Sequence, residues 1–134
     1  MAEIDLEALA ARAVQADPIM QGALLEEAWE ALAEHSAEFR RFAVSPSRRF
    51  DNKAAKFCAA LEAMAFESAA MMLVPERAWV RLDQWPSDFC APVASVMPIV
   101  KEEGNQIYTA TGSTLALALT AAALRARLME GEGE

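Results

Sequence analysis

The sequence has little cysteine and little histidine. It contains two cysteines, Cys58 and Cys90, separated by 31 residues, and one histidine, His35. Such a pair makes neither the disulfide framework of a small secreted domain nor a zinc site, which needs clustered ligands. His35 and Cys58 lie on apolar sides of predicted helices and Cys90 lies on a predicted strand, which favours packing roles over catalytic ones. We therefore expect free thiols and no bound metal.

Long apolar runs and an apolar N-terminus are also missing. The longest apolar stretch, Leu115–Leu124, is about half of the roughly 20 residues that a transmembrane helix needs, so it predicts a buried helix. The first residues, Met1–Asp5, carry acidic side chains and no apolar run, which argues against a signal peptide. The sequence predicts a cytoplasmic protein with no membrane contact.

Sequence motifs of catalysis are absent as well. The five glycines form neither a Walker-type phosphate loop nor the pattern of dinucleotide-binding folds. We predict no enzyme, no catalytic residue and no cofactor. The tripeptide Gly112-Ser113-Thr114, at the start of a predicted helix, has two interpretations. It can bind a phosphate with free amide hydrogens, or it can simply cap the helix, and we favour the cap.

Helix-forming apolar residues dominate the rest of the chain. Hydrophobic residues make up 54% of 134 residues, which excludes global disorder, and the length fits one domain. We predict an α+β fold of order α-α-α-β-β-β-α, with a small three-stranded antiparallel sheet packed by helices. The predicted helices span about 5–14, 18–42, 52–73 and 114–129, and the strands about 78–83, 89–100 and 106–111. This single compact domain divides into an acidic helical region with a basic end (1–50), an α-β-β-β-α core (51–129) and a disordered tail (130–134).

Two details of this fold prediction concern the core and the sheet. One stripe of the third predicted helix is formed by Phe57, Leu61, Met64, Ser68 and Met72. This spacing predicts an unbroken helix at the centre of the core, with Cys58 widening the stripe. Residues 78–83 alternate in the way of a half-buried strand. Pro92 and Pro98 are expected to confine the next strand to a sheet edge or to break it.

The charge is distributed unevenly along the chain. The formal net charge is −8, with twenty acidic and twelve basic residues. Residues 1–38 hold nine acidic residues and one basic residue, 39–56 hold six basic residues and one acidic residue, and 57–134 hold ten acidic and five basic residues. Free-standing nucleic-acid-binding proteins are usually basic, so direct nucleic-acid binding is not expected.

The two charged segments suggest opposite kinds of surface. One side of the second predicted helix carries Glu26, Glu27, Glu30, Glu34 and Glu38. Such a row is by default a solvated face. A regular array of carboxylates can also imitate a phosphate backbone, and in that case the face would bind a host protein that normally binds nucleic acid. The following segment interleaves phenylalanines with Arg40, Arg41, Arg48 and Arg49. Cationic side chains and aromatic rings together can bind phosphates or nucleotides. Alternatively, the arginines neutralise the acidic helices and the phenylalanine rings fill the core, and we favour this second interpretation.

Two segments resemble a known family. They are Ala69–Leu82, in which a helix ends in Leu73-Val74-Pro75-Glu76 before a Trp-bearing strand, and Thr111–Ala126, which opens an Ala/Leu-rich helix. Together they resemble small phage and prophage proteins of the phage ABA sandwich domain type, over about residues 51–128. The resemblance implies this fold and a phage context, and it implies no activity and no functional residue.

These observations lead to two functional hypotheses. The first is a non-enzymatic phage or prophage accessory protein that binds and inhibits a host protein, such as a defence effector that binds nucleic acid. An anti-CRISPR or other anti-defence inhibitor is its concrete form. The alternative is a small-molecule binder that uses the arginine-rich segment for a nucleotide or nucleotide signal. Three tryptophans and seven methionines in so short a chain leave apolar surface to cover, which favours a homodimer.

Overall fold

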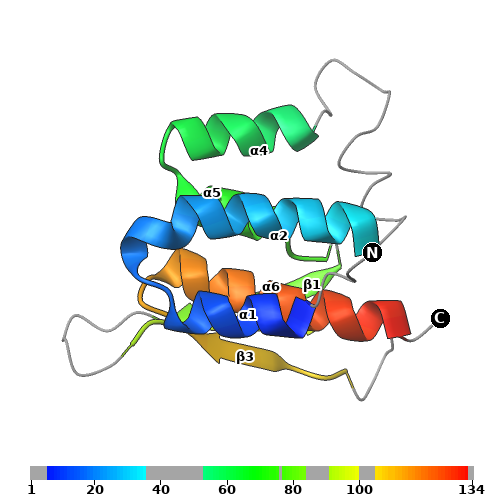
Figure 1. Cartoon of the computed structure of the whole chain (residues 1–134). Coiled ribbons are helices and arrows are strands. Elements are labelled where there is room, and N and C mark those ends of the chain that lie inside the picture. Colours follow the sequence, from blue (N-terminus) through cyan, green and yellow to red (C-terminus); the bar gives the residue numbers. More distant parts are fainter. Residues whose placement is uncertain (1–5, 36–52, 76, 84–90, 100–104, 133–134) are drawn as a thin grey trace.

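The computed structural model describes residues 6–35, 53–75, 77–83, 91–99 and 105–132. The chain folds as α+β in the predicted order, with a three-stranded antiparallel sheet packed against helices. Its elements are α1 (Leu6–Gln15), the short 3₁₀ helix η1 (Pro18–Met20), α2 (Gln21–His35), α4 (Lys53–Glu62), α5 (Phe66–Met71), β1 (Ala78–Asp83), β2 (Val93–Pro98), β3 (Tyr108–Thr111) and α6 (Leu115–Glu132). The described helices lie on one side of the sheet, with α6 next to it, α1 packed against α6, and α4 farthest from it (Figure 1).

Helix α6 is the centre of the core. It packs against α1, α2, α5 and all three strands, and every residue from Ala116 to Leu124 is buried. A helix that is apolar all round belongs inside a protein, and its many alanines let neighbouring elements approach closely. The hydroxyl of Thr120, the polar residue in this run, donates a hydrogen bond of 2.7 Å to the Ala116 carbonyl. The buried helix predicted from Leu115–Leu124 is therefore confirmed, and it occupies the central place that we predicted for residues 52–73.

The predicted third helix is broken into α4 and α5, so the prediction of one unbroken helix is wrong. At the end of α4, the Met64 amide donates to the Leu61 carbonyl and the Ala65 amide to the Ala60 carbonyl. This pair of bonds is a Schellman motif, which ends a helix with one residue in the left-handed region. Met64 is that residue, with φ of 59°, and its side chain points out, 72% exposed.

Strand β2 is the central strand, not an edge strand, because the sheet order is β1-β2-β3. The prediction from its prolines was therefore wrong. Val96 forms the last β2–β3 pair, with Tyr108. The nitrogen of Pro98 faces β3 beyond that pair, so its missing hydrogen interrupts no ladder bond. Pro92 precedes the strand and contributes its carbonyl, which accepts a bond of 3.3 Å from the Gly112 amide.

The ends of α2 and α6 refine the predicted boundaries. α2 follows η1, and its description stops at His35, so the predicted extension to residue 42 lies outside the described residues. At the start of α6 the Thr114 hydroxyl accepts a bond from the Leu117 amide, which makes Thr114 the N-cap. α6 ends at Glu132, three residues beyond the predicted end, so part of the tail predicted to be disordered is helical.

The helices are joined to their neighbours by a few specific contacts. Trp29 of α2 stacks on Phe57 of α4, with ring centroids 4.2 Å apart. The buried guanidinium of Arg127 on α6 donates to the carbonyls of Leu73 and Val74, at 3.0 and 3.2 Å. Because these carbonyls follow α5 and have no helical partner, Arg127 ties the start of the α5–β1 connection to the core.

Candidate functional site

The acidic row of α2 lies on the face opposite the core. Leu25, Ala28 and Leu32 are buried, whereas the four glutamates of the row within the described residues, Glu26, Glu27, Glu30 and Glu34, are exposed. At 3.6 residues per turn these four fall within an arc of about 100°. We call this surface the acidic face. The fifth predicted member, Glu38, lies outside the described residues.

Intramolecular pairing alters the charge of the acidic face. Arg12 of α1 donates two hydrogen bonds to the carboxylate of Glu27, at 2.9 and 3.2 Å. This two-pronged arrangement is the strongest geometry for an arginine and a carboxylate. Glu26 and Glu30 form no ion pair or hydrogen bond in the part of the chain that the structure describes. Glu27, at one edge of the acidic face, is therefore paired with Arg12, which the sequence alone did not indicate.

The other predicted charged segment is the arginine-rich one. Arg40, Arg41, Arg48 and Arg49 lie outside the described residues, and so does the side chain of His35. The nucleotide-binding alternative rests on these arginines, so no structural observation favours it.

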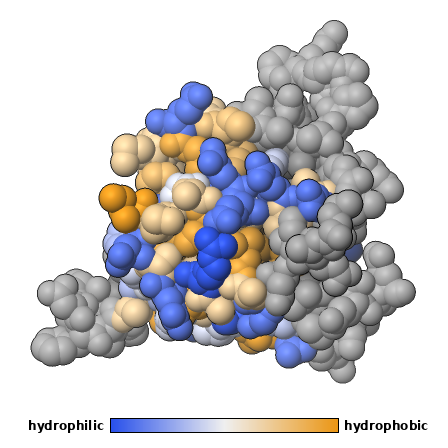
Figure 2. Space-filling model, viewed as in Figure 1, coloured by the Kyte–Doolittle hydropathy of each residue, from blue (hydrophilic) through white to orange (hydrophobic). Residues whose placement is uncertain are grey.

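Figure 2 shows what surrounds the acidic face: hydrophilic residues spread over α1 and α2, with apolar residues between them.

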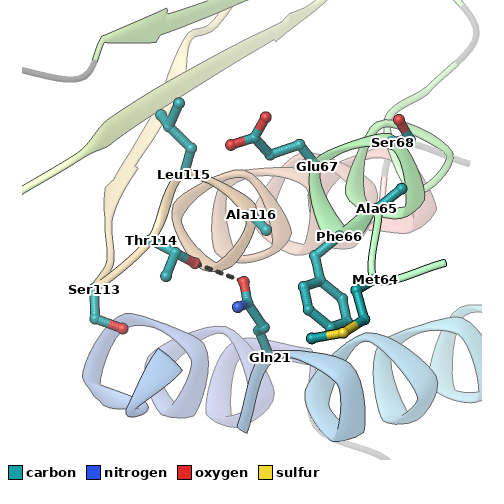
Figure 3. Close-up of a pocket in the computed structure, with 10 residues that line it drawn as sticks. All are labelled: Gln21, Met64, Ala65, Phe66, Glu67, Ser68, Ser113, Thr114, Leu115 and Ala116. Carbon is teal, nitrogen blue, oxygen red and sulfur yellow. Dashed lines mark hydrogen bonds between the residues drawn. The ribbon is translucent and has the colours of Figure 1, made fainter. Parts of the chain in front are cut away.

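A pocket of about 520 Å³ lies where the start of α6 meets the start of α5 and α2 (Figure 3). The Thr114 hydroxyl donates to the Gln21 side-chain oxygen at 3.0 Å, and the Ser113 hydroxyl donates to the Ala16 carbonyl at 2.7 Å. Phe66 and Met64 form an apolar side, and Glu67 contributes a carboxylate. None of the ten lining residues is a lysine, an arginine or a histidine. A pocket without a cation and with a carboxylate disfavours phosphate, so the cap is the better interpretation of Gly112-Ser113-Thr114.

Other sites of chemistry are also missing from the described residues. Cys58 is exposed, so its predicted place in the core stripe is wrong. α4 buries Phe57 against Trp29 of α2 and lies away from α6, and this contact leaves the neighbouring Cys58 outside. No three His, Cys, Asp or Glu side chains gather as a metal site within the described ranges. None of the described helices has both the length and the apolar content to span a membrane.

The outward face of the sheet is a surface that our sequence prediction did not include among the candidate sites. The side chains of Trp79, Arg81 and Asp83 alternate with inward-facing neighbours along β1, and Trp79 is 46% exposed. Trp79 stands opposite Met97 of β2, and Ser95 shares a hydrogen bond of 3.0 Å with Thr109 of β3. The alternation in residues 78–83 was the signal that could have identified this face.

Comparisons of this chain with protein-family models, with curated proteins and with solved structures find no match. The resemblance to phage ABA sandwich domain proteins therefore stays a prediction from two sequence segments. On the described surface, the acidic face gathers four exposed carboxylates on one helix.

Proposed function

We propose that this chain is a non-enzymatic phage or prophage accessory protein that binds and inhibits a host protein through the acidic face of α2. An anti-CRISPR or other anti-defence inhibitor is the concrete form of this proposal. Its proposed target is a basic surface that normally holds nucleic acid. The observation that carries the proposal is the exposed, one-sided array of Glu26, Glu30 and Glu34 on a well-packed helix.

The spacing of this array suits a basic surface that binds nucleic acid. At a rise of 1.5 Å per residue, Glu26 and Glu34 lie about 12 Å apart along the helix axis. Glu30 lies midway between them, so the three carboxylates that Arg12 does not pair repeat about every 6 Å along the axis. This is a regular row of negative charge, sparser than the one charge per about 3.4 Å along one DNA strand. Because Leu25 and Leu32 are fully buried, the backbone of α2 is fixed before a partner arrives, so binding has to order only the glutamate side chains and not the helix.

Reversing two charges on the acidic face is expected to weaken partner binding strongly. The chain is immobilised and used to capture proteins from a host lysate, and the captured protein is then purified for titration. We expect E26R/E30R to weaken its binding on the order of a hundredfold, because each arginine replaces an attraction with a repulsion. The matched control is E62R/E67R, which changes the net charge equally on exposed residues of α4 and α5. Equal weakening by both variants would contradict a specific role of the acidic face.

A further inference from the structure

Strand β1 is an edge strand of the sheet that the described residues form. It lies at one side of the sheet and pairs only with β2 among the described residues. The Ile99 amide donates to the Arg77 carbonyl at 2.7 Å, so these two residues form a hydrogen-bonded pair. Because hydrogen-bonded and non-hydrogen-bonded pairs alternate in an antiparallel ladder, the odd-numbered residues of β1 form the backbone hydrogen bonds to β2. The amide and carbonyl groups of Ala78, Val80 and Leu82 therefore point away from β2, toward the open edge. Edges of this kind are templates for another strand.

The side chains along this edge carry a self-complementary pattern. Arg77, Trp79, Arg81 and Asp83 all lie on the outward face of the sheet, because alternate residues share a face. Arg81 pairs with Asp83 at 3.0 Å, with the Arg81 side chain 65% exposed. Along the strand the order is therefore cation, aromatic ring, cation and anion. An antiparallel copy of the same strand presents this order in reverse, which places opposite partners against each other.

We propose that β1 pairs antiparallel with β1 of a second copy of this chain, about a twofold axis at Val80. This pairing joins the two sheets into one of six strands. Val80 then faces the partner's Val80, and Ala78 and Leu82 face each other across the axis, with about six backbone hydrogen bonds in all. The proposal is independent of the proposed function, because it uses none of the residues of the acidic face.

Side-chain chemistry favours this register, which is centred on the strand, over those centred on either neighbouring outward-facing residue. On the outward face Arg77 stands opposite the partner's Asp83, which is an ion pair, and Trp79 stands opposite the partner's Arg81, which is a cation–π pair. These are non-hydrogen-bonded positions, where opposing Cα atoms are only about 4.5 Å apart. An axis at Arg81 would place two copies of Arg81 against each other, and an axis at Trp79 would oppose Arg77 and Arg81. Both alternatives repel.

The opposite edge of the sheet has no such pattern. Strand β3 has four residues against six in β1, and the described residues on its outward face, Thr109 and Thr111, are uncharged. A second copy therefore finds both a longer ladder and opposite charges at the β1 edge. Two copies paired there also cover the exposed Leu82, which is 39% exposed in the single chain.

Charge-swap variants test both the dimer and its register. Light scattering and native mass spectrometry on the full chain are expected to show a homodimer. R77D places a carboxylate against the partner's Asp83, and D83R places a guanidinium against the partner's Arg77. The dimer dissociation constant of each variant alone is therefore expected to rise at least about tenfold. An equimolar mixture of the two restores opposite charges at both contacts, and a heterodimer is expected. E62R, away from the edge, should leave the homodimer unchanged, and circular dichroism confirms that each variant is folded.

Three results would overturn the proposal: a monomeric native chain, single variants that dimerise as the native chain does, or a mixture that stays monomeric. Amide exchange gives a second readout that does not depend on any variant. Dimer formation should protect the amides of Val80 and Leu82, whereas those of Thr109 and Thr111 stay in rapid exchange. Protection at the β3 edge in place of the β1 edge would also contradict the proposed pairing.

Discussion

Replacing Leu124 with alanine lowers the free energy of unfolding by about 3 to 5 kcal/mol, the range for a leucine removed from a rigid core. Leu124 is fully buried on α6, which is enclosed by α1, α2, α5 and the sheet. With neighbours on all sides, the core cannot collapse into the space that the side chain leaves. Because domains of this size are stable by only about 5 to 15 kcal/mol, the variant loses a large part of its stability. Urea denaturation measures the loss as a lower urea concentration at the midpoint of unfolding.

The matched control is Ile19→Ala, which also truncates a large aliphatic side chain. Ile19 lies in η1 and is 87% exposed, so its truncation should change the free energy of unfolding by no more than about 0.5 kcal/mol. Similar losses for the two variants would mean that α6 is not the centre of the core.

Replacing Gly112 with alanine is expected to cost about 3 kcal/mol, because the new methyl group meets backbone that cannot move aside. A Cβ atom at Gly112 would lie 2.7 Å from the Ala118 nitrogen and 3.1 Å from the Leu117 carbonyl carbon. Both atoms belong to the first turns of α6, where the Ala118 amide already bonds to Thr114. To admit the methyl group, β3 and α6 must separate. Thermal and urea unfolding measure the cost.

Gly22→Ala provides the comparison for Gly112. A Cβ atom at Gly22 would lie 3.3 Å from the edge of the Phe66 ring, which can tilt by a few tenths of an ångström. Gly22 is inside α2, where alanine favours the helix, so we expect a gain of about 0.5 kcal/mol or no change. If both glycine variants were equally destabilised, the close approach of β3 to α6 would not be the cause.

The elements of this fold that depend on local pattern could be predicted from the sequence. Alternation in residues 78–83 predicted β1, and the apolar run after Thr114 predicted a buried α6. The break between α4 and α5 could not be predicted, because the apolar spacing continues through it and the left-handed position holds Met64 where glycine is usual. The central place of β2 was missed for a different reason. Whether Pro98 interrupts a ladder depends on which neighbour its nitrogen faces, and this is a property of the assembled sheet.

The candidate site, too, could be predicted from the sequence only where it depends on local pattern. Helical spacing was enough to place Glu26 and Glu30 on one exposed face of α2, because the buried face of a helix fixes the opposite one. The ion pair of Glu27 with Arg12 joins two helices, so it depends on how α1 packs against α2, which no spacing within one helix reveals. The pattern along the β1 edge was visible in the sequence, but its significance depends on that edge being open.

The most direct test of the proposed function is a competition between this chain and nucleic acid for the captured host protein. A labelled duplex is bound to the host protein, and the chain is added at rising concentration while the bound fraction is followed by fluorescence anisotropy. If the acidic face occupies the nucleic-acid site, the native chain and E62R/E67R displace the duplex, whereas E26R/E30R does not. A ternary complex of host protein, duplex and chain, or equal displacement by E26R/E30R, would contradict the account.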